Sequence, residues 1–147
     1  FEVVRQVVEG RIEFVKVAMQ PGKPQACGVV RAPDGREVAF LGLPGNPVSV
    51  FVSAWAFLRP LLAAFQRLPT VWPSVELPVA EGWRSPPGRR QYTPVRIVDG
   101  AVSPTHRLGS GSHLVASLHL ADGLAVVPED ADGPGERVAV HLVRALA

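Results

Sequence analysis

The sequence predicts an α/β segment followed by an all-β segment, and three observations lead to this prediction. Residues 12–43 alternate apolar and polar side chains as strands do, and residues 48–65 carry apolar side chains at helical spacing. Beyond them, short strand-like runs are separated by turns. The proline-containing stretch RLPTVWPSVELP, residues 67–78, separates the two patterns. We therefore expect two domains, at residues 1–70 and 75–147.

The first half contains a short helix, three strands and one long helix. We expect the short helix at residues 1–10, ending at Gly10, and strands at residues 12–19, 25–32 and 36–43. The turns QPGKP and PDG connect these strands. The long helix contains Pro60, which removes one backbone hydrogen bond and should bend it near Phe57. Together these elements are typical of part of an α/β sandwich.

The second half is a series of short strands typical of a small β-barrel or sandwich. They are expected at residues 75–80, 90–98, 101–108, 123–128 and 137–143. The segment 112–121 fits either a strand or a single helical turn.

Composition excludes several functional classes. Of 147 residues, 47% are apolar and the net charge is +2. The basic residues form no cluster, which argues against nucleic-acid binding. Cys27 is the single cysteine, so no disulfide framework or cysteine zinc site is possible, and its apolar run predicts a buried, inert thiol.

No signal-peptide pattern opens the chain, and the longest apolar stretch is interrupted by polar residues. We judge that stretch too short to span a bilayer, so we expect no membrane contact and a cytoplasmic location.

The stretch LPGNPVS begins the long helix. Asn46 is a good N-cap, Pro47 suits the first helical position, and Gly45 permits a sharp turn from strand into helix. Ser49 then lies in the first turn. The first-turn N–H groups are expected to point outward unpaired, and the helix dipole favours negative charge there, so the helix start is a ready anion site. The alternative is a well-capped helix and nothing more.

Two further loops offer groups that could bind an anion. Lys23 lies between Gly22 and Pro24, and the stretch LGSGSH brings Ser110, Ser112 and His113 close together. A loop lysine is usually solvated and a Gly-Ser loop is usually a plain turn, although serine hydroxyls and backbone N–H groups can also form an oxyanion nest.

Four motifs in order carry a family resemblance: FVKVAMQPGKP, FLGLPGNPVSVFV, PGRRQYTPVRI and GSGSHLVASLHLADGLAVVPED. Together they resemble the C-terminal portion of molybdopterin molybdenumtransferase, a family that includes the gephyrin E domain. The resemblance implies that residues 1–70 are the later half of a molybdopterin-binding α/β domain. Residues 75–147 would form a small C-terminal β-barrel-like domain.

The resemblance also implies an activity, which is insertion of molybdate into adenylylated molybdopterin with Mg²⁺, releasing AMP. The full-length family enzyme is expected to be a homodimer. The matching motifs place six residues at the molybdate pocket: Lys23, Pro24, Gly45, Asn46, Ser49 and Ser112. Molybdate is a dianion, so cationic and N–H donors suit it.

The chain departs from the family pattern at two positions. The family usually has lysine where Gln20 stands and arginine where Pro94 stands. Arg96, two residues further on the same strand face, is an alternative cation, and so are Arg89 and Arg90 nearer the turn.

We expect no metal site within this segment and no catalytic triad. The carboxylates Asp34, Asp130 and Asp132 are scattered, and so are the histidines at positions 106, 113, 119 and 141. The alternative function, from another class, is a non-catalytic anion-binding or scaffold module of the same fold.

Overall fold

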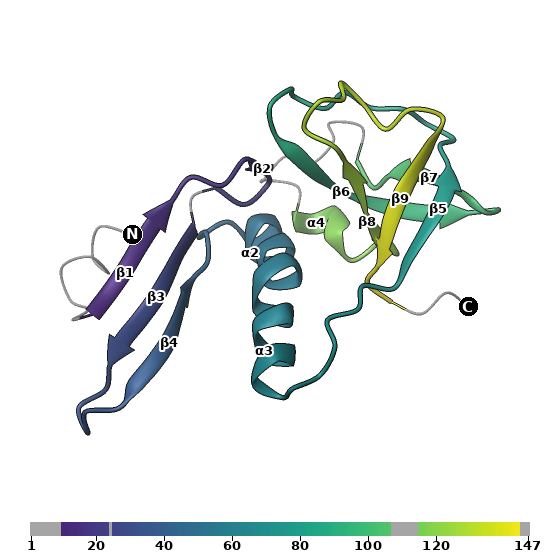
Figure 1. The fold of residues 1–147 in the computed structure, drawn as a ribbon. Helices are drawn as coiled ribbons and strands as arrows, with labels where there is room; N and C mark the ends of the chain where they lie inside the picture. Colours follow the sequence, from purple (N-terminus) through teal and green to yellow (C-terminus); the bar gives the residue numbers. More distant parts are fainter. Residues whose placement is uncertain (1–9, 24, 107–114, 145–147) are drawn as a thin grey trace.

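The computed structural model describes residues 10–23, 25–106 and 115–144, so the helix expected at residues 1–10 lies outside the described residues. The described chain is mostly strand with few helices. It forms a three-stranded sheet, a six-stranded sheet and one long helical segment that starts between them (Figure 1).

The three-stranded sheet is antiparallel, in the order β1-β3-β4. Its strands are β1 (Gly10–Val15), β3 (Gln25–Arg31) and β4 (Glu37–Gly42). The strands expected at 25–32 and 36–43 are therefore confirmed. Most side chains of β3 and β4 are exposed or half-buried, because no described element covers the sheet. Cys27 is exposed for this reason, so the prediction of a buried thiol is wrong.

The strand expected at residues 12–19 is divided into two. After β1 the chain leaves the first sheet, and the short strand β2 (Met19–Gln20) pairs in parallel with β6 of the other sheet. In this register Met19 lies opposite Arg90 and Gln20 opposite Gln91. The loop that follows β2 is thereby held close to both sheets.

The long helix is confirmed and runs without interruption over residues 47–65. It comprises α2 (Pro47–Ser53), a π-helical segment (Ala54–Leu58) and α3 (Arg59–Phe65). The π-helical segment ends at Leu58, two residues before Pro60, and the Arg59 N–H donates to the Ala54 carbonyl. The expected local disturbance therefore takes the form of a π-helical turn that accommodates the proline's missing donor.

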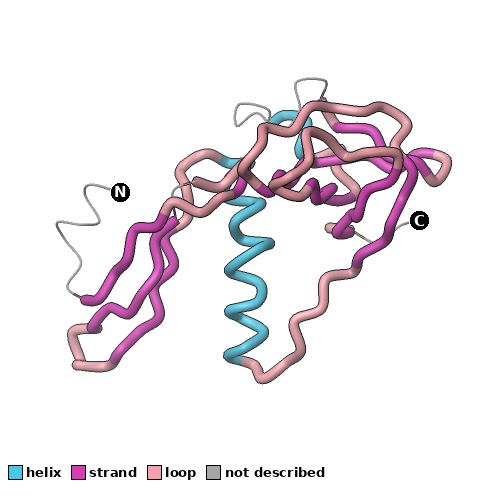
Figure 2. The backbone as a smooth tube through the Cα atoms, turned by 45° about the horizontal axis from the view of Figure 1, so that its top comes forward, coloured by secondary structure: helices cyan, strands magenta, loops and turns pink. Residues whose placement is uncertain are grey.

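The helix is unusually exposed for one so apolar. Residues Pro47–Phe65 are predominantly apolar, yet only 22% of their most apolar stretch is buried. Contrary to the expectation from sequence, this helix is long and apolar enough to cross a membrane by length and composition, which by itself is weak evidence. Figure 2 shows its α3 half extending away from the six-stranded sheet.

The six-stranded sheet has the order β2-β6-β8-β9-β5, with β7 paired to β6. Its other strands are β5 (Ser74–Pro78), β6 (Arg90–Val98), β7 (Ala101–Pro104), β8 (Gly123–Val127) and β9 (Arg137–Leu142). Each of the five strands expected in this half is found, although β7 ends at Pro104 where the expected strand ran to residue 108. The segment 112–121, which fits either a strand or a helical turn by sequence, contains the helical turn α4 (Val115–Leu118).

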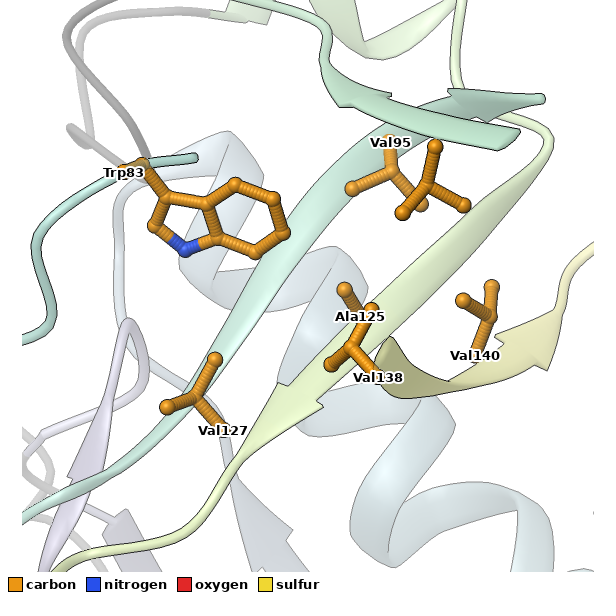
Figure 3. Packing of buried hydrophobic residues seen from close by; sticks show 7 residues of the cluster. Trp83, Val95, Ala125, Val127, Val138 and Val140 are labelled. Carbon is orange, nitrogen blue, oxygen red and sulfur yellow. The ribbon is translucent and has the colours of Figure 1, made fainter. Parts of the chain in front are cut away.

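Two apolar clusters stabilise the described chain. The first lies within the six-stranded sheet and is shown in Figure 3: Trp83, Val95, Val102, Ala125, Val127, Val138 and Val140. Full burial of a valine contributes about 1.5–3 kcal/mol. The second joins helix to sheet and contains Met19, Val52 and Leu124. It fixes the start of the helix against β2 and β8.

Candidate oxyanion site

Asn46 caps the helix as the sequence predicts. Its backbone is extended, with φ −82° and ψ 132°. Its Oδ1 accepts hydrogen bonds from the N–H groups of Val48 and Ser49, at 3.1 and 3.4 Å. Pro47 occupies the first helical position, where its missing N–H costs nothing.

The first-turn donors are not open to an anion, which corrects one expectation. Pro47 has no N–H, and the N–H groups of Val48 and Ser49 both bond Asn46 Oδ1. The Val50 N–H bonds the Asn46 carbonyl at 2.8 Å. A ligand at this helix start must therefore be held mainly by side chains.

The turn from strand into helix does not require a glycine at position 45, so the expected role of Gly45 in that turn is wrong. Its φ is not among the positive values, and a Cβ placed there would meet nothing within 4 Å. Gly45 is exposed and lies directly before the cap. Its effect is to leave the surface beside the helix start clear of side chains.

The loop that carries Lys23 packs directly on the helix. Gly22 is buried with φ +127°, and a Cβ there would lie 2.7 Å from Met19 Cε and 3.1 Å from Ser53 Oγ. Only glycine fits this approach. Ser53 follows Ser49 by one helical turn, and the two share a helix face. Lys23 is exposed and Ser49 is only 6% exposed.

Gln25 joins the same loop to the same helix. Its side chain is 3% exposed, and its Nε2 donates both to the Gly22 carbonyl and to Ser53 Oγ, the latter at 2.5 Å. Gln25 is also the first residue of β3, where it lies opposite Val15. One side chain therefore links the three-stranded sheet, the lysine loop and the helix.

The candidate cations on β6 differ in their surroundings. Arg90 lies beside β2, and its guanidinium pairs with the Glu129 carboxylate at 3.3 Å, which offsets its charge. Arg96 is exposed, opposite Ser103 on β7. Pro94 is buried opposite Leu124, so Arg96 is about 7 Å further along the strand.

Two of the expected site residues, Pro24 and Ser112, lie outside the described residues, as do Ser110 and His113. The structure thus brings the Lys23 loop onto the helix at Ser53, one turn after Ser49.

The described residues contain no cluster of carboxylates that could bind Mg²⁺. Within residues 10–23, 25–106 and 115–144, no group of three or more His, Cys, Asp or Glu side chains could hold a metal ion. Mg²⁺ prefers oxygen ligands that include carboxylates. The described residues therefore do not fit this metal, and we derive no step through it.

An aromatic and cationic cluster marks the junction of helix, linker and six-stranded sheet. The Arg59 guanidinium lies 4.7 Å from the centroid of the Trp55 ring and 6.0 Å from that of Trp72, and Trp72 stacks on His141 at 6.0 Å. Burial, and secondarily the charge of Arg59, lowers the pKa of His141 below its ordinary value.

Sequence reasoning did not single out Gln25 or Ser53 as parts of this site. A signal was present for Ser53, because serines four residues apart in an apolar helix share one face. No such signal was present for Gln25, because a polar residue is common where a loop such as QPGKP ends and a strand begins.

Comparison with known proteins agrees with this architecture. Residues 76–143 match the family described as the MoeA C-terminal region (domain IV). Molybdopterin molybdenumtransferase 2 of Mycobacterium tuberculosis is 39% identical over 121 residues, which are 81% of this chain and 28% of the relative. Molybdopterin molybdenumtransferase of Synechococcus elongatus is 37% identical over 111 residues, 74% of this chain and 26% of the relative.

Two solved structures share the fold. The molybdopterin biosynthesis moeA protein from Pyrococcus horikoshii OT3 has a TM-score of 0.72 at 23% identity, covering 91% of this chain and 33% of that one. The molybdenum cofactor biosynthesis protein from Pyrococcus furiosus has a TM-score of 0.70 at 25% identity, covering 90% of this chain and 46% of that one.

These matches define a class first: residues 76–143, just under half of the chain, are similar to the MoeA C-terminal region. The chain as a whole is homologous to the C-terminal portion of the molybdopterin molybdenumtransferases, as its motifs indicated. It spans 28% and 26% of the length of the two relatives described above.

Proposed function

We propose that this chain is the C-terminal part of a molybdopterin molybdenumtransferase and contributes its molybdate site. The reaction inserts molybdate into adenylylated molybdopterin and releases AMP. The relatives at 39% and 37% identity carry this enzyme name, which supports the proposal. We also propose that the three-stranded sheet and the helix belong to an α/β domain and that the six-stranded sheet is a β-barrel-like domain.

The observation that supports this site most strongly is the packing of the lysine loop on the helix turn. Gly22 contacts Ser53, and Ser53 is one turn from Ser49 on the same face. Lys23 follows Gly22 directly and is exposed, and Gly45 leaves open space before the helix start. A cation and a hydroxyl around an open space suit a tetrahedral dianion.

The charge present predicts a weak site. Gln20 and Pro94 replace two cations of the family pattern, and Arg90 is paired with Glu129. Charge-assisted hydrogen bonds are each worth about 1.5–3 kcal/mol, so two lost contacts reduce affinity by orders of magnitude. The remaining interaction depends on Lys23, which is exposed, so it should weaken steeply with salt.

The remainder of the proposal concerns the full-length enzyme. We place it in the cytoplasm as a homodimer whose Mg²⁺ ligands lie beyond the described residues of this chain. Adenylylated molybdopterin is its second substrate.

The test uses the full-length enzyme and the two lysines of this chain, Lys16 and Lys23. Both are exposed, so Lys16→Ala removes the same charge away from the packed loop and is a matched control. With adenylylated molybdopterin supplied, Lys23→Ala should lower molybdate-dependent AMP release at least tenfold, and Lys16→Ala should leave it unchanged. Equal activities in the two variants contradict the proposed site.

A second candidate, a scaffold module, rests on the exposed end of the helix and the segment after it. Leu62 and Phe65 of the helix are 49% and 66% exposed, and Leu68 and Val71 beyond it are 56% and 62% exposed. Such an apolar surface favours association with another polypeptide. If association were the function, Leu62→Glu with Phe65→Glu would abolish binding to that partner while Lys23→Ala would not.

A further inference from the structure

We propose that Gln25 is a positioning residue for the oxyanion site: its side-chain amide holds the Lys23 loop in register with the helix turn of Ser49. This inference rests on the proposed function for its ligand, but its structural part is tested separately. Gln25 touches no ligand in this proposal and acts through the loop.

The first step is the geometry of the amide. Nε2 donates to the carbonyl of Gly22, one residue before Lys23, and to Ser53 Oγ, one turn after Ser49. Both acceptors are buried, as is Gln25 itself at 3% exposure. A single donor group therefore links the residue before Lys23 to the residue one helical turn after Ser49.

The second step is that the amide is poorly explained by stability alone. Its Oε1 is buried and has no hydrogen-bond partner within residues 10–23, 25–106 and 115–144. A buried acceptor without a donor is costly, and an unbranched apolar side chain of similar length would avoid that cost. The amide is instead the one group here that can bond a loop carbonyl and a helix hydroxyl together.

The third step is that packing alone leaves the loop only partly fixed. Pro21 and Gly22 are buried, but Lys23 is exposed, so burial holds the start of the loop and not the lysine itself. Met19 anchors β2 in the helix–sheet cluster and lies against Gly22, so it too holds the loop only as far as Gly22. Without the Gln25 amide, the described contacts would let Lys23 move relative to Ser49, and an oxyanion site loses affinity when its donors are not held in place.

The test compares Gln25→Met and Ser53→Ala with Val140→Ala in the full-length protein. Val140 is fully buried in the six-stranded sheet, so its truncation lowers stability away from the loop. All three variants are measured well below their melting temperatures. The readouts are ¹⁵N relaxation of the Gly22 and Lys23 amides, the Kd for molybdate, and the split between KM and kcat.

We expect Gln25→Met to increase the mobility of both amides and to weaken molybdate binding at least tenfold. The KM for molybdate should rise while kcat stays within about twofold, because loosened positioning is overcome by saturating substrate. Ser53→Ala should give a smaller effect, and the double variant should be no worse than Gln25→Met alone. Val140→Ala should lower only the melting temperature.

Two results overturn the inference: unchanged mobility of Gly22 and Lys23 in Gln25→Met, or equal effects in Val140→Ala. If the unsubstituted protein binds no molybdate, the proposed function fails, and the relaxation measurement still decides the role of Gln25.

Discussion

Replacing Asn46 by alanine tests how the helix start is held. The change removes the Oδ1 acceptor that bonds the N–H groups of Val48 and Ser49 at 3.1 and 3.4 Å. Val48 and Ser49 are 1% and 6% exposed, so little water can replace the lost acceptor. Loss of a good N-cap costs about 1 kcal/mol, and the burial moves the expected cost to about 1–2 kcal/mol.

At this chain length each kcal/mol corresponds to about 2–4 °C, so the melting temperature should fall by about 2–8 °C. The assay is thermal unfolding followed by circular dichroism, with Asn46→Asp as the control. Aspartate keeps a side-chain oxygen at the cap and should retain most of the stability. An unchanged melting temperature in Asn46→Ala, or an equal loss in Asn46→Asp, would refute the assignment of the cap.

Three further predictions concern single side chains. Thr93 is fully buried, and its hydroxyl has no hydrogen-bond partner within the described residues. Thr93→Val should therefore leave the melting temperature equal or higher. A large fall in the melting temperature, measured by calorimetry, would show that the hydroxyl does form a hydrogen bond. Because the pKa of His141 is lowered in the folded protein, the unfolded chain binds a proton at this histidine more readily, and the free energy of unfolding should decline as pH falls below about 6.5. His141→Gln should flatten that decline when unfolding is measured across pH. An identical decline in the variant would exclude His141 as its cause. Cys27 is exposed and should react with a maleimide in the native protein at a rate close to that of the unfolded chain, so strong protection would show that its sheet face is covered.

The strands could be predicted closely because they depend on local alternation and turn residues. Strand β6 (Arg90–Val98) has the predicted limits, and the proline-rich stretch before β5 (Ser74–Pro78) ends the helical pattern as expected. The helix cap was equally predictable, because Asn46 and Pro47 act on their immediate neighbours.

The errors arise where a residue's environment depends on distant chain. Cys27 lies in an apolar strand, but its burial requires an element packed on the sheet, and no described residues supply one. The split of β1 from β2 depends on pairing with β6, about 70 residues later in the chain, which no local pattern encodes.

The site was predictable in part. Its motifs pointed to Lys23 and Ser49, and the structure brings the lysine loop onto the helix through Gly22 and Ser53. The occupation of the first-turn donors by Asn46 could have been anticipated, since the cap that favours the helix uses the same N–H groups that an anion would need. The role of the Gln25 amide could not, because it depends on a contact between residues 28 positions apart.

The most direct measurement of the central claim is calorimetric titration of molybdate into the full-length protein, its Lys23→Ala variant and its Lys16→Ala variant. We predict weak, salt-sensitive binding that prefers molybdate, tungstate or sulfate to chloride, lost in Lys23→Ala and retained in Lys16→Ala. Equal affinities in the unsubstituted protein and Lys23→Ala would remove Lys23 from the site and contradict the placement of the oxyanion pocket between the lysine loop and the helix start.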